Sequence, residues 1–202
     1  MKICYYCGRT NEEKYTKDHV PPKCIFPKNK PKNLITVPCC FKCNKEMSSL
    51  DQKMRNWMGL LSTKMPKEIS QRVFRDYKKD MKSFNDYLSH IKAHNKFMDS
   101  RGFPRLLYYP NLAEVNIWLS RIIKGLFYKR EKRPIVKNVV FSSELLSWLK
   151  IPRTEEFPME QGLEFRPYFI YYDFHDGDCL DTSTWLLIFY DIVAFLVRAK
   201  TR

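Results

Sequence analysis

The sequence contains no hydrophobic run that is long enough to cross a membrane. Its longest late apolar run, residues 185–197, is interrupted by Asp191 and is shorter than the roughly 20 apolar residues of a transmembrane helix. No apolar signal segment precedes Cys4, and the chain has no internal repeat and no low-complexity stretch. These absences argue against a membrane-spanning, secreted or repeat protein. We expect a soluble protein without a membrane partner, and its 202 residues are enough for one domain or two small ones.

The number of cysteines is odd. The chain has seven, so they cannot all pair as disulfides. Together with the missing signal segment, the odd count favours a reducing compartment in which thiols bind metal ions, and we expect a cytoplasmic protein.

Acidic residues are too few to balance the basic ones. The chain carries 36 Lys and Arg against 22 Asp and Glu, a net charge of +14. The excess is uneven: residues 1–60 carry +7, residues 61–133 carry +10, and residues 134–202 carry −3. This pattern indicates a polyanion-binding face in the first two thirds. A lysine-rich surface that is merely solvated is the alternative.

Four of the cysteines form two C-x-x-C pairs, Cys4 with Cys7 and Cys40 with Cys43. Two such pairs can complete a tetrahedral zinc site, and four thiolates leave no coordination position open for chemistry. The alternative is a set of scattered buried thiols. A zinc ion bound in this way would be structural, and the chemistry would belong to the polar groups that it holds in place: Asp18, His19 and Asn44.

Apolar spacing gives a coarse outline of the remaining structure. Residues 34–37 predict a short strand that leads to Cys40, and Ser48 or Ser49 can cap a helix that begins near Leu50. Residues 66–100 predict one or two helices, whose basic face is the candidate nucleic-acid-binding surface: Arg72, Arg75 and Lys79. Simple solvation of that face is an equally good interpretation.

Asn111 is the expected cap of an amphipathic helix that continues through Leu126. The last third of the chain then changes character. Residues 135–141 predict a strand and residues 142–150 a short helix. Residues 168–174 and 185–197 predict the strands of a hairpin, although the second run is also compatible with a buried helix.

The order C-x-x-C, Asp18-His19-x-x-Pro22, Asn33-Leu34, C-x-x-C-Asn44 resembles the HNH endonucleases, which have a ββα-metal active site. It is especially similar to the branch with a four-cysteine zinc, such as the phage Holliday-junction resolvases. The resemblance covers about the first quarter of the chain. It implies a zinc-stabilised, treble-clef-like ββα module (1–60). Charge and apolar spacing add a basic helical region (61–133) and a small mixed α/β region (134–202), so we expect an α+β fold.

The resemblance also implies roles for individual residues. His19 would be the general base, Asp18 and Asn44 would bind the catalytic divalent ion, and Asn33 would be the loop residue that orients His19. An oxygen-rich ligand pair favours Mg²⁺ or Mn²⁺ over a second zinc. Asp51 could add a ligand, or it could be an acid that the dipole of its helix stabilises.

The activity implied is metal-dependent hydrolysis of phosphodiester bonds in DNA, leaving a 5′-phosphate. A neutral imidazole can take the proton of the attacking water. Neighbouring residues on a strand point to opposite faces, so Asp18 would hold the ion while His19 reaches the water. The alternatives are a zinc module that binds DNA or RNA without cleaving it, and an interaction adaptor whose last third binds a protein partner or a second copy of the chain.

Overall fold

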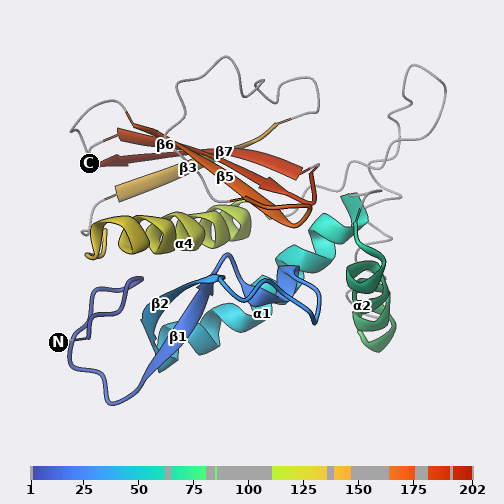
Figure 1. The fold of residues 1–202 in the computed structure, drawn as a ribbon, viewed down its shortest axis with the longest axis horizontal. Coiled ribbons are helices and arrows are strands. Elements are labelled where there is room, and N and C mark those ends of the chain that lie inside the picture. Colours follow the sequence, from blue (N-terminus) through green and yellow to red (C-terminus); the bar gives the residue numbers. More distant parts are fainter. Residues whose placement is uncertain are drawn as a thin grey trace.

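A computed structural model describes residues 2–61, 65–80, 85, 111–135, 139–146, 164–175, 182–191 and 193–201. The helix α4 lies in the middle of the molecule (Figure 1), with an N-terminal module on one side and a five-stranded sheet on the other. The elements are both helices and strands, which confirms the expected α+β class. The division at residues 60 and 133 stays a prediction.

The N-terminal module has the expected ββα order. Its strands β1 (Tyr15–Val20) and β2 (Ile35–Cys40) pair antiparallel, with His19 opposite Thr36. A single 3-10 turn, Lys23–Ile25, lies between them, and the helix α1 (Phe41–Leu61) follows β2 directly. The predicted strand at residues 34–37 is confirmed as part of β2.

The predicted start of a helix near Leu50 is wrong, because α1 begins nine residues earlier at Phe41. The side chains of the first two turns are mostly exposed and polar, so apolar spacing appears only from Met54 onward. The backbone N–H of Phe41 donates to the carbonyl of Lys14 at 3.0 Å. Because β2 ends at Cys40 and α1 begins at Phe41, no loop connects the strand to the helix.

The helix α2 (Lys67–Lys79) packs against α1 through Ile69 and Val73. Gly59 of α1 makes this approach possible, because a Cβ there would lie only 2.8 Å from a methyl carbon of Val73. Arg55 of α1 and Asp76 of α2 form an ion pair between the two helices. The remainder of the helical prediction for residues 66–100 falls almost entirely outside the described residues.

The helix α4 (Leu112–Glu131) is buried on more than one side. The side chain of Asn111 accepts a hydrogen bond from the N–H of Ala113 at 3.0 Å, which confirms the expected cap. At Gly125 a Cβ would lie 2.4 Å from a methyl carbon of Val20, so the absent side chain lets α4 rest directly against β1. This contact places α4 beside the strand that carries Asp18 and His19.

The sheet is antiparallel throughout, in the order β3-β7-β6-β5-β4. Its strands are β3 (Val139–Leu146), β5 (Phe169–His175), β6 (Thr182–Phe189), β7 (Val193–Thr201) and the two-residue β4 (Glu164–Phe165). One set of buried side chains extends from Cys4 through α1 and α4 to Val197 of this sheet. The module and the sheet therefore share a continuous core through α4.

Two predictions for this region are wrong. Residues 142–146 form a strand instead of the start of a helix; β3 is an edge strand with mostly exposed or half-exposed side chains, so it shows little of the apolar pattern of a strand. The run 185–197 is two strands, β6 and β7, and not one. Tyr190 and Asp191 turn the chain between them with φ of 54° and 56°, a pair of left-handed residues typical of a tight hairpin.

Within the described part of the chain, every helix is too short or too polar to cross a membrane.

Candidate active site

The two C-x-x-C pairs come together as the spacing predicts. The sulfur atoms of Cys4, Cys7, Cys40 and Cys43 all lie within 4.8 Å of one another. Zinc–sulfur bonds of about 2.3 Å in a tetrahedron place sulfur atoms about 3.8 Å apart, and Cys7 Sγ lies 3.9 Å from Cys40 Sγ. The cluster therefore fits one zinc ion with little adjustment.

Local structure prepares each pair for this role. The first pair lies in a tight turn in which Gly8 N–H donates to Cys4 O at 2.8 Å, and Gly8 has a φ of 74°. The second pair spans the junction of β2 and α1. The guanidinium of Arg9 donates to Cys7 Sγ at 3.3 Å, so a positive charge lies beside sulfur atoms that must be thiolates to bind a metal ion.

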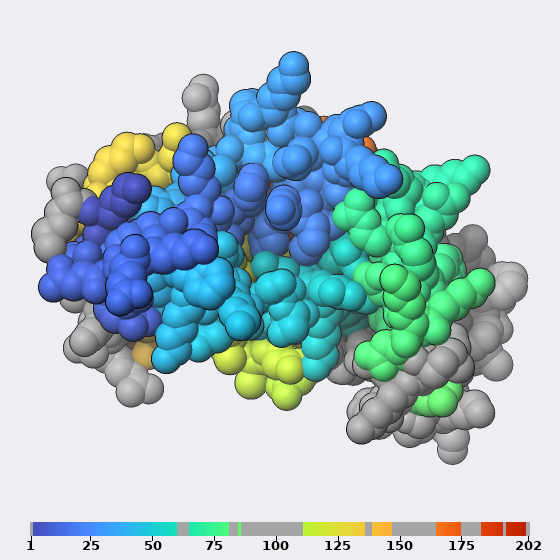
Figure 2. Space-filling model, turned by 90° about the horizontal axis from the view of Figure 1, so that it is seen from below, coloured from blue at the N-terminus to red at the C-terminus, as the bar shows by residue number. Residues whose placement is uncertain are grey.

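A cavity of about 420 Å³ opens between β1, the 3-10 turn and α1. Figure 2 shows the face of the molecule that the N-terminal module and α2 form. The walls of the cavity contain all three polar residues that the sequence singles out, together with three lysines: Asp18, His19, Asn44, Lys17, Lys23 and Lys45. Asp51 of α1 also lines it.

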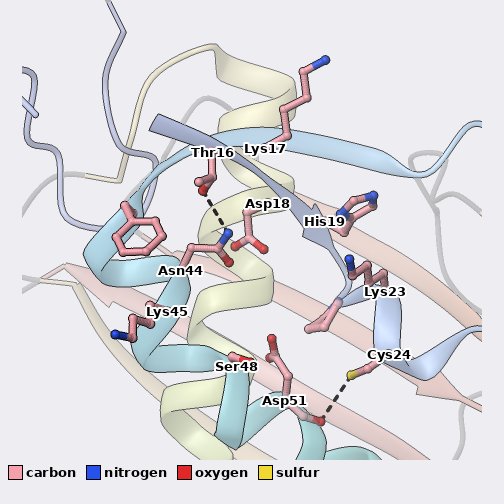
Figure 3. Close-up of a pocket in the computed structure, with 12 residues that line it drawn as sticks. Thr16, Lys17, Asp18, His19, Lys23, Cys24, Asn44, Lys45, Ser48 and Asp51 are labelled. Carbon is pink, nitrogen blue, oxygen red and sulfur yellow. Dashed lines mark hydrogen bonds between the residues drawn. The ribbon is translucent and has the colours of Figure 1, made fainter. Parts of the chain in front are cut away.

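Asp18 and Asn44 point toward one another across this cavity (Figure 3). The Asn44 amide is oriented by a hydrogen bond from its Nδ2 to Thr16 Oγ1 at 2.9 Å, which leaves Oδ1 on the side of Asp18. A carboxylate and an amide oxygen are ligands that a hard divalent cation prefers. The donor set therefore fits the expected Mg²⁺ or Mn²⁺.

His19 points away from this pair of oxygens, as alternation along a strand requires (Figure 3). Its side chain is half-buried. Burial lowers the pKa of His19 below its ordinary value, and the neighbouring Lys23 lowers it further. The imidazole is therefore neutral at neutral pH, which is the state that can accept a proton.

Asp18 is buried and forms an ion pair with Arg121 of α4. Its Oδ2 atom accepts from Arg121 Nη2 at 2.6 Å, from Arg121 Nε at 3.1 Å and from the hydroxyl of Tyr5 at 2.6 Å. Burial and the charge of Asp18 raise the pKa of Tyr5 well above its ordinary value, so Tyr5 remains a hydrogen-bond donor.

Arg121 also binds Asp51 on its other side. Arg121 Nη1 lies 3.0 Å from Asp51 Oδ1 and 2.9 Å from Asp51 Oδ2. The indole N–H of Trp118 donates to Asp51 Oδ1 at 3.0 Å. Burial raises the pKa of Asp51 to about 6, although Arg121 opposes this shift. Both oxygens of Asp51 are engaged by protein donors, and its role as a metal ligand stays a prediction.

The remaining predicted residues do not line the cavity. Asn33 is exposed in the loop before β2. On α2, Arg75 and Lys79 are exposed, whereas Arg72 is half-buried, donates to the carbonyl of Cys24 at 3.4 Å and pairs with Glu68 at 3.6 Å. Their roles in orienting His19 and in binding nucleic acid stay predictions.

Sequence reasoning missed Arg121 and Tyr5. Arg121 interrupts the apolar side of a helix in which Leu119, Ile122 and Ile123 are all buried. A charged residue in such a place is almost never buried unless it is paired. This was the available signal, although it does not identify the partner.

Comparison with known proteins identifies the module. Residues 4–58 match the model of a protein family described as HNH endonuclease. The resemblance inferred from the sequence is thereby confirmed for this segment, which contains the cysteine cluster, both strands of the hairpin and most of α1. The segment is about a quarter of the chain and ends well before α4. No curated protein and no solved structure matches the chain.

Proposed function

We propose that this protein is a metal-dependent HNH endonuclease that hydrolyses phosphodiester bonds in DNA, with His19 as general base and with Asp18 and Asn44 as ligands of a divalent ion. The observation that carries the proposal is that all three side chains line one cavity, within the segment that matches the family and contains the cysteine cluster. A divalent ion bound there supplies the charge that neutralises the scissile phosphate and the leaving oxygen.

The residues of the chain divide the work. Asp18 and Asn44 present oxygen atoms to the cavity, and His19 points in another direction but also lines the cavity, where it can accept the proton of an attacking water. The lowered pKa of His19 keeps its imidazole neutral for this purpose. The four cysteines would hold a zinc ion that joins the N-terminal turn to the β2–α1 junction, and four thiolates would leave this ion no open position for chemistry.

The direct test is cleavage of supercoiled, linear, branched and single-stranded DNA, and of RNA, by the purified protein. We expect nicked or linear products with Mg²⁺ or Mn²⁺, and none when a chelator removes the ion while zinc is retained. The substrate that is cut fastest identifies the target class. Binding without cleavage across all substrates and ions would replace this proposal with the non-cleaving zinc module.

Three lysines give the cavity a basic rim, which suits a phosphate backbone. Lys17, Lys23 and Lys45 line the cavity, and all three are exposed. Phe41 also lines it and is 46% exposed, so an aromatic face is available beside the lysines. Exposed lysines of this kind contact phosphates and release the counterions condensed on DNA.

Replacing Lys17, Lys23 and Lys45 together by Gln is expected to weaken DNA binding. The slope of log affinity against log salt should become shallower by about 0.9 for each phosphate that is no longer neutralised. Fluorescence anisotropy of labelled DNA over a salt series measures the change. The matched control replaces three lysines that are exposed and do not line the cavity: Lys129, Lys132 and Lys200. An equal loss of affinity in the control would show that overall charge, and not this rim, binds DNA.

A further inference from the structure

Arg121 lies outside the segment that matches the family, yet it contacts both side chains assigned to the divalent ion. Its Nη2 atom lies 2.6 Å from Asp18 Oδ2 and 3.4 Å from Asn44 Oδ1. The helix that carries it reaches the module because Gly125 allows α4 to touch β1. A residue of the second half of the protein therefore contributes to the site of the first.

The guanidinium approaches from the interior and not from the cavity. The side chain of Arg121 is 3% exposed and does not line the cavity, whereas Asp18, Asn44 and Asp51 all do. Arg121 therefore lies behind the carboxylates, on the side away from the substrate. A cation that competed with the divalent ion would have to lie in the cavity, which Arg121 does not line.

The guanidinium of Arg121 donates hydrogen bonds to two carboxylates, one on each side of it. Nη1 takes both oxygens of Asp51, while Nε and Nη2 both donate to one oxygen of Asp18. Such planar, multiple hydrogen bonding fixes orientation as well as charge, and an ammonium group cannot reproduce it. Arg121 is held in turn by Tyr5, whose hydroxyl accepts from Nε at 3.0 Å.

The three donors that reach Asp18, which are the Tyr5 hydroxyl and Nε and Nη2 of Arg121, all use its Oδ2 atom. Within the described part of the chain, no hydrogen bond is directed to Oδ1. The carboxylate is therefore anchored by one oxygen and has the other one available. Outer contacts of this kind orient metal-binding carboxylates, and their removal typically lowers metal affinity or activity about 10–100-fold.

We propose that Arg121 is a positioning residue for the reaction: by fixing Oδ2 of Asp18 from behind, it holds the carboxylate in the orientation in which Asp18 and Asn44 together bind the divalent ion. The inference rests on the proposed function of this site. It makes α4 part of the active site, because residues 4–58 alone supply only the Tyr5 hydroxyl to Asp18 and lack the guanidinium that also fixes this carboxylate.

The test measures Mn²⁺ binding by electron paramagnetic resonance in a zinc-loaded His19→Ala background, which removes cleavage from the readout. We expect Arg121→Gln to weaken Mn²⁺ binding about 10–100-fold, and Arg121→Lys to weaken it less. The matched control is Arg130→Gln on the same helix, which breaks the ion pair with Asp173 instead. In the otherwise unaltered chain, Arg121→Lys should lower kcat and leave the KM for DNA unchanged.

The outcomes separate this inference from the function on which it rests. Mn²⁺ binding that is unchanged or tighter in a folded Arg121 variant overturns the positioning role, and tighter binding would identify Arg121 as a competing cation. If Arg121→Gln does not fold, Arg121→Lys decides, since it keeps the buried charge without the fork. The proposed function itself fails if the His19→Ala reference protein does not bind Mn²⁺, or if Asp18→Asn leaves its Mn²⁺ binding intact. The inference then fails with it.

Discussion

Replacing His19 by Ala is expected to abolish DNA cleavage while the fold, the zinc content and DNA binding remain. A general base contributes about 10²–10⁴-fold to the rate, and the described residues of the cavity offer no second imidazole. The half-buried position of His19 at the end of β1 allows the substitution without a large loss of packing. Single-turnover cleavage of plasmid DNA with Mg²⁺ or Mn²⁺ measures the effect.

The control for His19→Ala is Thr36→Ala. Thr36 is exposed and lies directly opposite His19 in the hairpin, so this change perturbs the same strand pair and removes no proposed catalytic group. Thr36→Ala should cleave at nearly the rate of the unaltered protein. Cleavage by His19→Ala within a few-fold of that rate would reject the assignment of the base, whatever ion is present.

Removing the zinc is expected to unfold the N-terminal module and to abolish cleavage. Structural zinc contributes on the order of 10–16 kcal/mol of apparent binding free energy, and this energy supports folding. The four cysteines join the loop of the first pair to the β2–α1 junction, where the other contacts of the loop are mainly those of Tyr5, whose N–H donates to the carbonyl of Pro38 at 3.0 Å. Circular dichroism and limited proteolysis during chelation report the loss.

Cysteine substitutions make this test specific. The Cys40→Ser variant should lose both the zinc ion and the fold of the module, whereas the Cys24→Ser variant should keep both. Cys24 is also a free, partly buried thiol, but it donates to the carbonyl of Asp51 and does not belong to the cluster. Cys39→Ser is a stricter control than Cys24→Ser, because the sulfur of Cys39 lies 3.9 Å from Cys4 Sγ although Cys39 is not one of the four clustered cysteines. A metal-free protein that melts cooperatively at an unchanged temperature would show that the cluster does not stabilise the fold.

The parts of the site that could be predicted from the sequence are those that local spacing determines. Two C-x-x-C pairs specify a cluster almost regardless of what lies between them, and Asn44 follows its cysteine directly. Asn111 could be recognised because a cap acts on the N–H groups only two or three residues away. These signals are complete within a few neighbouring residues.

The parts that failed depend on contacts between distant segments. The start of α1 was hidden because its first turns are exposed and mostly polar, and the turn at Tyr190 and Asp191 lacks the Gly or Asn that usually marks such a hairpin. Arg121 is separated from Asp18 by about half of the chain. Nothing in either local sequence specifies that pair, since only the packing of α4 against β1 creates it.

The contact between Gly125 and Val20 restricts how this protein can change over time. A methyl group at position 125 would overlap the side chain at position 20, beside the proposed base. A larger residue at one position therefore requires a smaller one at the other. Two sites in separate halves of the gene are thus tied together, and neither half can drift, or be exchanged for a counterpart from another gene, without regard to the other.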